Sequence, residues 1–175
     1  FDALWVLVLD DLNTSDLIAN LGITLFAVPM VLFASIGGRL AQSVGPFRLG
    51  TFGLLVGAIA MFAYGHAPSG AIMLAISLVH ATNDGFTVSS CGVAVGLVVP
   101  GERQASAQGL LGGVETLTAG ITATVIGQVY EHFGRTVAYT SCAAMMLVLI
   151  LCAALLSGSS WRLRDISAQH TAASV

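Results

Sequence analysis

Residues 71–129 read AIMLAISLVHATNDGFTVSSCGVAVGLVVPGERQASAQGLLGGVETLTAGITATVIGQV. Two long apolar runs are separated here by a short polar hinge, residues 100–104. Each run carries one acid deep inside it, Asp84 in the first and Glu115 in the second. An ionisable group in hydrocarbon costs about 2.5–3.5 kcal/mol on insertion scales, so it usually faces a bundle interior or an aqueous cavity. The stretch therefore predicts two membrane helices that carry functional acids.

The composition of the whole chain predicts a membrane protein. Of its 175 residues, 56% are hydrophobic and only 9% are charged, and the mean hydropathy is +0.90. Soluble domains carry about 25% charged residues. The net charge of −3 is too small to indicate nucleic acid as a partner. The partner that the composition predicts is the lipid bilayer.

Nothing in the sequence indicates an enzyme, a metal site or a cofactor. The chain lacks Gly-x-Ser-x-Gly and His-Glu-x-x-His motifs. No set of His, Cys and acidic residues has the spacing of metal ligands. The three cysteines, Cys91, Cys142 and Cys152, lie inside apolar runs. We expect them to act as small packing residues.

Five apolar segments are long enough to cross a bilayer core, which takes about 20 residues. We expect these spans at about residues 17–37, 49–67, 71–99, 105–129 and 137–156. Residues 1–9 resemble the last turns of another helix, so the chain reads as a C-terminal piece of a longer protein. Residues 157–175 are polar and predict a disordered tail. The predicted fold class is an all-α, polytopic membrane helical bundle.

The arginines predict how the spans are oriented. Cytoplasmic loops of membrane proteins carry the excess of Lys and Arg. Only Arg135 falls at the other membrane face from the five remaining arginines, Arg39, Arg48, Arg103, Arg162 and Arg164. The count places the C-terminal tail in the cytoplasm, with the spans in the plasma (inner) membrane.

Two connections share a Gly-x-x-x-polar-x-x-Gly pattern with an arginine soon after it. They are Gly38 to Gly45, around Gln42, and Gly127 to Gly134, around Glu131. Three predicted helices separate the two patterns, so they should lie on opposite membrane faces. This is the arrangement of inverted three-helix repeats in secondary transporters. We expect residues 38–48 to form a tight basic loop.

That loop, GGRLAQSVGPFR (residues 37–48), resembles the signature loop of the major facilitator superfamily, Gly-x-x-x-Asp-Arg-x-Gly-x-Arg. VVPGERQASAQGLLG and YEHFGR are similar to the connections that flank the eleventh helix of that family. The resemblance covers about residues 10–156 and aligns them with helices seven (partial) to twelve. Gln42 and Ser43 stand where the family has an acid and a base. The residues to which the resemblance gives a gating role are Gly38, Gly45 and Arg48.

The resemblance implies a twelve-helix transporter of which this chain is half, with the missing N-terminal half as its partner. Helices seven, eight, ten and eleven of such a protein line the cavity, and nine and twelve pack outside. The uncharged spans 49–67 and 137–156 agree with outer positions. Three glycine pairs spaced by four are typical of close helix packing, namely Gly53/Gly57, Gly92/Gly96 and Gly109/Gly113.

Polar residues in the first acid-bearing span recur at steps of three and four, which places them on one helical face. They are Ser77, His80, Asp84, Thr87 and Cys91. His80 and Asp84 are one turn apart and can interact directly. A carboxylate beside an imidazole in a low dielectric is a candidate proton carrier. The predicted proton-coupling and substrate-cavity residues are Asp84, Glu115, His80, Asn83, Thr87 and Gln108.

These residues predict a secondary transporter of small molecules, with proton-coupled efflux (antiport) of apolar or drug-like compounds as the leading function. Two alternatives stay open, a facilitator or importer of a polar solute and an inactive half-transporter fragment. Structural roles are also open for the site residues. His80 and Asp84 could form a buried pair that fixes packing. Glu115 could pair with the N-terminal half, and Asn83 could hydrogen-bond between helices.

Overall fold

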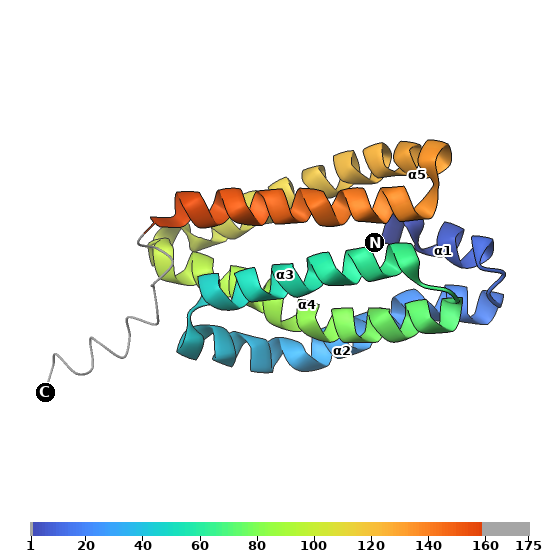
Figure 1. The fold of residues 1–175 in the computed structure, drawn as a ribbon. Coiled ribbons are helices and arrows are strands. Elements are labelled where there is room, and N and C mark those ends of the chain that lie inside the picture. Colours follow the sequence, from blue (N-terminus) through green and yellow to red (C-terminus); the bar gives the residue numbers. More distant parts are fainter. Residues whose placement is uncertain (1, 159–175) are drawn as a thin grey trace, which may run out of the picture.

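The structure is a computed structural model that describes residues 2–158. The tail predicted at 157–175 therefore lies almost wholly outside the described residues, as do Arg162 and Arg164. Within residues 2–158 the chain is helical and has no strand, which confirms the all-α fold class (Figure 1). The elements are α1 (Asp2–Asp11), α2 (Asp16–Val44), α3 (Pro46–His66), α4 (Gly70–Val98), the 3-10 helix η1 (Gly101–Arg103) and α5 (Gln104–Ser157).

Helix α5 consists of two arms that meet at Gly134. This glycine has φ 79° and ψ 177°, which is not helical. The chain doubles back at this point, and the two arms run antiparallel (Figure 1). Each arm is long enough to cross a bilayer core, which takes about 20 residues.

The connection between α2 and α3 is shorter than the sequence suggested. The prediction of a loop over residues 38–48 is wrong in its extent, because α2 continues to Val44 and α3 begins at Pro46. Only Gly45 leaves the helical conformation, with φ 105° and ψ 128°. A continuing helix satisfies its own backbone donors and acceptors, which a bilayer demands. The proline then fits at the start of α3, where its missing N–H costs nothing.

Helix α4 packs against both α2 and α3, and α5 packs on the other side of α3. The approach of α2 to α4 is closest at two glycines. A Cβ at Gly37 would lie 2.8 Å from the Gly85 carbonyl oxygen, and a Cβ at Gly85 would lie 2.8 Å from the Met30 carbonyl oxygen. A methyl group fits at neither position. Small residues thus set the distance between these two helices, as is usual in membranes.

The short helix α1 is anchored by Trp5. Its indole nitrogen donates to the Ala19 carbonyl oxygen over 3.0 Å, and its ring covers Gly22, where a Cβ would lie 2.3 Å from the ring. The side chain is fully buried, like those of Tyr64, Met73 and Tyr139 in the core to which it belongs.

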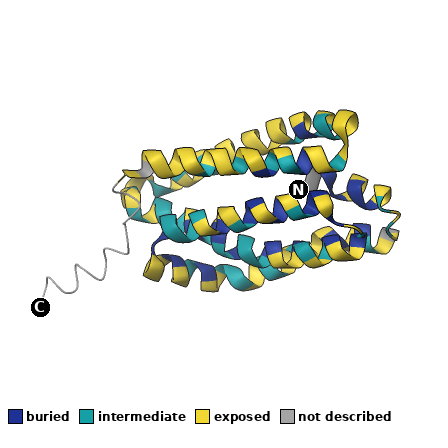
Figure 2. Cartoon of the chain, in the orientation of Figure 1, coloured by how far each residue is buried: buried dark blue, intermediate teal, exposed yellow. Residues whose placement is uncertain are grey.

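The outward surfaces are apolar. Four helices are long and apolar enough to cross a membrane, the last of them spanning both arms of α5. Their exposed positions carry large hydrophobic side chains, such as Ile59, Val79, Leu117 and Leu155, and exposed residues line the outside of the bundle (Figure 2). Exposed apolar surface on this scale is typical of a face that meets lipid. The protein is therefore a polytopic helical bundle that crosses the membrane several times.

Candidate functional site

Helix α4 holds the polar residues that the sequence grouped on one face. Its start is fixed by Ser69, whose hydroxyl accepts from the Ile72 backbone N–H over 3.4 Å. Asp84 lies at the midpoint of the helix, about 21 Å from its end at Val98. In a helix that crosses a bilayer core about 30 Å thick, a residue at the midpoint lies near the middle of that core.

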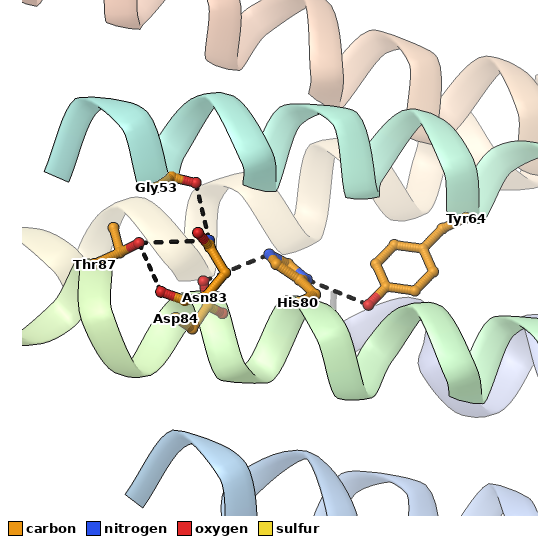
Figure 3. Close-up of polar contacts among 6 residues, drawn as sticks. All are labelled: Gly53, Tyr64, His80, Asn83, Asp84 and Thr87. Atoms are coloured by element: carbon orange, nitrogen blue, oxygen red, sulfur yellow. Dashed lines mark hydrogen bonds and ion pairs between the residues drawn. The ribbon is translucent and has the colours of Figure 1, made fainter. Parts of the chain in front are cut away.

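His80 lies between two polar partners (Figure 3). Its Nδ1 is 3.2 Å from the Tyr64 hydroxyl of α3, and its Nε2 is 3.5 Å from a carboxylate oxygen of Asp84. The histidine is 6% exposed and the tyrosine fully buried, whereas the Asp84 side chain keeps 29% of its surface exposed. On α2, Phe26 places its ring edge-on to the imidazole, with the centroids 5.7 Å apart. The three polar groups thus form a row from the core to the accessible carboxylate.

Asn83 and Thr87 connect α4 to α3. The Asn83 amide donates to the Gly53 carbonyl oxygen over 2.9 Å, and the Thr87 hydroxyl donates to the Asn83 carbonyl oxygen over 3.0 Å. Thr87 is buried against Gly53, because a Cβ on that glycine would overlap the hydroxyl. Both predicted cavity residues therefore lie in the contact between two helices of this chain (Figure 3).

The predicted residues of α5 lie apart from this row. Gln108 donates from its side-chain amide to the Gly92 carbonyl oxygen over 3.3 Å, which joins the start of α5 to the end of α4. Glu115 is exposed on the first arm, about 17 Å from the start of α5. The structure thus brings His80 and Asp84 together and leaves Glu115 on a separate helix.

The predicted gating residues surround the α2–α3 connection. Gly38 is half-buried within α2, Gly45 is buried at the break, and Arg48 is half-buried in the first turn of α3. They lie at the end of the bundle where α4 ends and α5 begins (Figure 1).

Two open cavities lie elsewhere in the described chain, between α3 and the arms of α5. One has a volume of about 490 Å³ and is lined by Leu4, Met61, Tyr139 and the stretch of α5 around Thr118–Ile126. The other, of about 480 Å³, lies between Met61 and both α5 arms, and its lining is almost wholly apolar. Neither lining includes the predicted site residues. No cluster of three His, Cys, Asp or Glu side chains that could hold a metal ion occurs among residues 2–158.

Comparison with protein families decides what kind of bundle this is. The model of the Major Facilitator Superfamily matches residues 2–170, nearly the whole chain. The chain belongs to the major facilitator superfamily. Searches of curated proteins and of solved structures gave no match. Membership makes the protein a membrane transporter in general, which agrees with its apolar, membrane-length helices.

Within this facilitator fold, sequence reasoning missed Tyr64. It lies on α3, 16 residues before His80, and no local spacing relates two residues on different helices. The glycine pairs were a partial signal. Gly53 and Gly57 lie in the contact with α4, and a Cβ on Gly57 would lie 3.5 Å from the His80 Nε2. The pairs Gly92/Gly96 and Gly109/Gly113 instead face open space.

Proposed function

We propose that this facilitator is a proton-coupled secondary transporter that exports small, apolar compounds by antiport. The observation that carries the proposal is the contact of 3.5 Å between His80 and Asp84 in the middle of α4. A carboxylate and an imidazole in low dielectric can share one proton, because burial favours the protonated acid whereas a positively charged imidazole favours the ionised one. Burial of ions in a membrane is expensive, and such residues usually mark proton relays or substrate paths.

Asp84 is the member of the pair that exchanges protons with the proposed transport cavity between the two halves of the protein. Its side chain is 29% exposed, whereas the imidazole behind it is 7% exposed. A proton that arrives from water therefore meets the carboxylate first. Protonation neutralises a charge at the bilayer midplane, which lowers the cost of closing the cavity around the site. The cavity therefore closes more readily when Asp84 is protonated than when it is ionised, and this couples proton binding to alternating access.

Glu115 contributes the second acid of the proposed cavity. It is exposed together with Ala119 and Thr122, which lie one and two turns further along the same face of the first α5 arm. A polar surface at this depth requires water or a protein partner, because lipid cannot satisfy it. We assign that partner to the N-terminal half of a twelve-helix protein, with the substrate between the halves. The same proposal places the protein in the plasma (inner) membrane, with its C-terminal tail in the cytoplasm.

The test uses the full-length protein in proteoliposomes that contain a pH-sensitive dye. Ethidium serves as the apolar probe and lactose as the polar one. We expect ethidium to move against a proton flux, and Asp84→Asn or Glu115→Gln to reduce the proton flux at least tenfold, since each change removes an ionisable carboxylate. The matched control is Asp10→Asn, which neutralises an acid at the end of α1, outside the predicted spans.

The outcomes separate the competing functions. Gradient-driven flux that is unchanged in both acid variants would overturn the role proposed for the acids. Lactose uptake without proton movement would favour a facilitator or importer of a polar solute. The absence of any flux from the isolated chain, with flux from the full-length protein, would identify the chain alone as an inactive half.

A further inference from the structure

Tyr64 reaches His80 from a helix that carries no charged residue in its membrane-spanning part. Its hydroxyl is 3.2 Å from the Nδ1 of His80, and its side chain is fully buried. The ring is held from behind by Tyr139 of α5, with the centroids 5.7 Å apart. The phenol is therefore packed in one orientation, with its oxygen directed at one nitrogen of the imidazole (Figure 3).

We propose that Tyr64 is a positioning residue, whose hydroxyl holds the Nδ1 side of His80 so that the Nε2 side faces Asp84. A neutral imidazole has one donor and one acceptor nitrogen, and the partner of one nitrogen decides the role of the other. When the phenol donates to Nδ1, the ring proton is on Nε2, where it faces the carboxylate. This inference rests on the proposed function for its effect on transport, but not for its effect on the histidine.

A phenol suits this position because its oxygen both donates and accepts. With neutral His80, the hydroxyl donates to Nδ1. When Nδ1 is protonated, its N–H donates to the same phenol oxygen, and the hydroxyl hydrogen turns away. Relative to neutral His80 beside ionised Asp84, the charged state holds one further proton, taken up from the solution, and the phenol carries its own proton in both states. Tyr64 can thus serve both protonation states without moving.

The surroundings of His80 are consistent with this assignment. Among the described residues, Asp84 from α4 and Tyr64 from α3 contact the imidazole, and Tyr139 from α5 packs behind that phenol. Helix α2 contributes the ring of Phe26, which does not titrate. Gly57 of α3 lies beside the imidazole, since a Cβ there would be in ordinary van der Waals contact with Nε2, at 3.5 Å.

Tyr139 provides a matched control. It is as deeply buried as Tyr64 and packs against it, but its hydroxyl has no hydrogen-bond partner among the described residues. Tyr64→Phe and Tyr139→Phe therefore remove the same atom from neighbouring rings. Only the first change removes a contact with His80.

The direct test is nitrogen NMR of the full-length protein, with its histidines labelled with ¹⁵N, in lipid nanodiscs. The His80 signals are those that disappear in His80→Gln. We expect the wild type to show a protonated Nε2 and a hydrogen-bonded, unprotonated Nδ1. Tyr64→Phe should move the Nδ1 signal to that of a free lone pair, and Tyr139→Phe should leave it unchanged. Replacement of Tyr64 by 3-fluorotyrosine, a stronger donor of the same shape, should move the signal in the opposite direction.

Transport gives the second readout. The hydrogen bond from a charged imidazole is stronger than that from a neutral one, so the loss of the phenol oxygen disfavours the protonated ring. In Tyr64→Phe the midpoint of pH-dependent ethidium flux should move to acidic pH by about one unit, a tenfold change in proton concentration. Tyr139→Phe should keep the wild-type midpoint.

These results distinguish the inference from the proposed function. If the acid variants retain flux but the Nδ1 signal depends on Tyr64, the proposed coupling fails and the positioning role stands. Identical His80 spectra in wild type and Tyr64→Phe, or equal changes in both phenylalanine variants, would overturn the positioning role.

Discussion

At the scale of single residues, α4 is joined to α3 by two side-chain contacts, from Asn83 to the Gly53 carbonyl oxygen and from His80 to the Tyr64 hydroxyl. Steps of three and four predicted one face of α4 with Ser77, His80, Asp84, Thr87 and Cys91. The structure buries Ser77, His80 and Thr87 and leaves Cys91 exposed. The one-turn spacing correctly anticipated the contact of His80 with Asp84. The periodicity of one helix contains no information on its neighbours, however. Thr87 is buried against Gly53 of α3, and Tyr64 contacts His80 through the same interface.

Asn83 illustrates the difference between an inter-helix contact and a cavity residue. Because its amide donates to the Gly53 carbonyl oxygen, we expect Asn83→Ala to destabilise the protein. Polar contacts between membrane helices contribute about 0.6 kcal/mol on average and up to about 1.7 kcal/mol. The loss should appear as a lower free energy of unfolding in detergent titrations that follow helix content.

Thr82→Ala is the control for this prediction. The Thr82 hydroxyl donates to the Leu78 carbonyl oxygen of its own helix over 2.9 Å, so its removal breaks no contact between helices. A variant Asn83→Ala that is as stable as Thr82→Ala but binds ethidium more weakly would instead assign Asn83 to the substrate cavity.

At the scale of elements, each copy of the repeated Gly-x-x-x-polar-x-x-Gly pattern ends at a break between two helices, which the spacing predicted only in part. The last glycine of each copy, Gly45 and Gly134, has positive φ and is the point where one helix ends and the next begins. The sequence indicated turns at these places. It could not show that each turn would be so short, because the other residues of the pattern also occur within helices.

Gly134 should tolerate no side chain, although there is space for one. A Cβ at this position would meet nothing within 4 Å, but φ 79° with ψ 177° is a conformation that almost only glycine adopts. We expect Gly134→Ala to lower the free energy of unfolding by about 1–3 kcal/mol.

Gly127→Ala is the matched control, because this glycine also faces open space and lies inside the first arm of α5. There the change should be neutral or stabilising by up to about 1 kcal/mol. Equal effects of the two substitutions would show that space, rather than backbone conformation, matters at the break between the arms.

At the scale of the whole molecule, composition predicted that the protein is a membrane bundle but did not predict how its helices pack. An apolar chain with few charges predicted a membrane bundle, and the family match confirmed the predicted superfamily. The order in which helices pack depends on surfaces that the sequence presents only as glycines and small residues, such as the approach of Gly37 to Gly85. Cavities lined by α5 and Met61 had no sequence signal for the same reason.

The orientation of the bundle is open to a direct test. Arg39, Arg48 and Arg103 lie at or near the bundle end where α2 and α4 finish, and Arg135 lies at the opposite end. The positive-inside rule places the first end in the cytoplasm. Pro68, in the exposed turn between α3 and α4, should then face the outside, and Glu102, exposed in η1, the inside.

Single cysteines at these two positions, introduced after the native cysteines are replaced by alanine, measure this directly. A membrane-impermeant maleimide should label Pro68→Cys in intact cells, because the turn is exposed to the outer solution. It should label Glu102→Cys only after the membrane is permeabilised, because the bilayer then no longer separates η1 from the reagent. The reverse pattern would invert the orientation and make Arg135, rather than the three arginines of the other end, the cytoplasmic residue. It would also require the proton that reaches Asp84 to enter from the face opposite to the one that the export proposal uses.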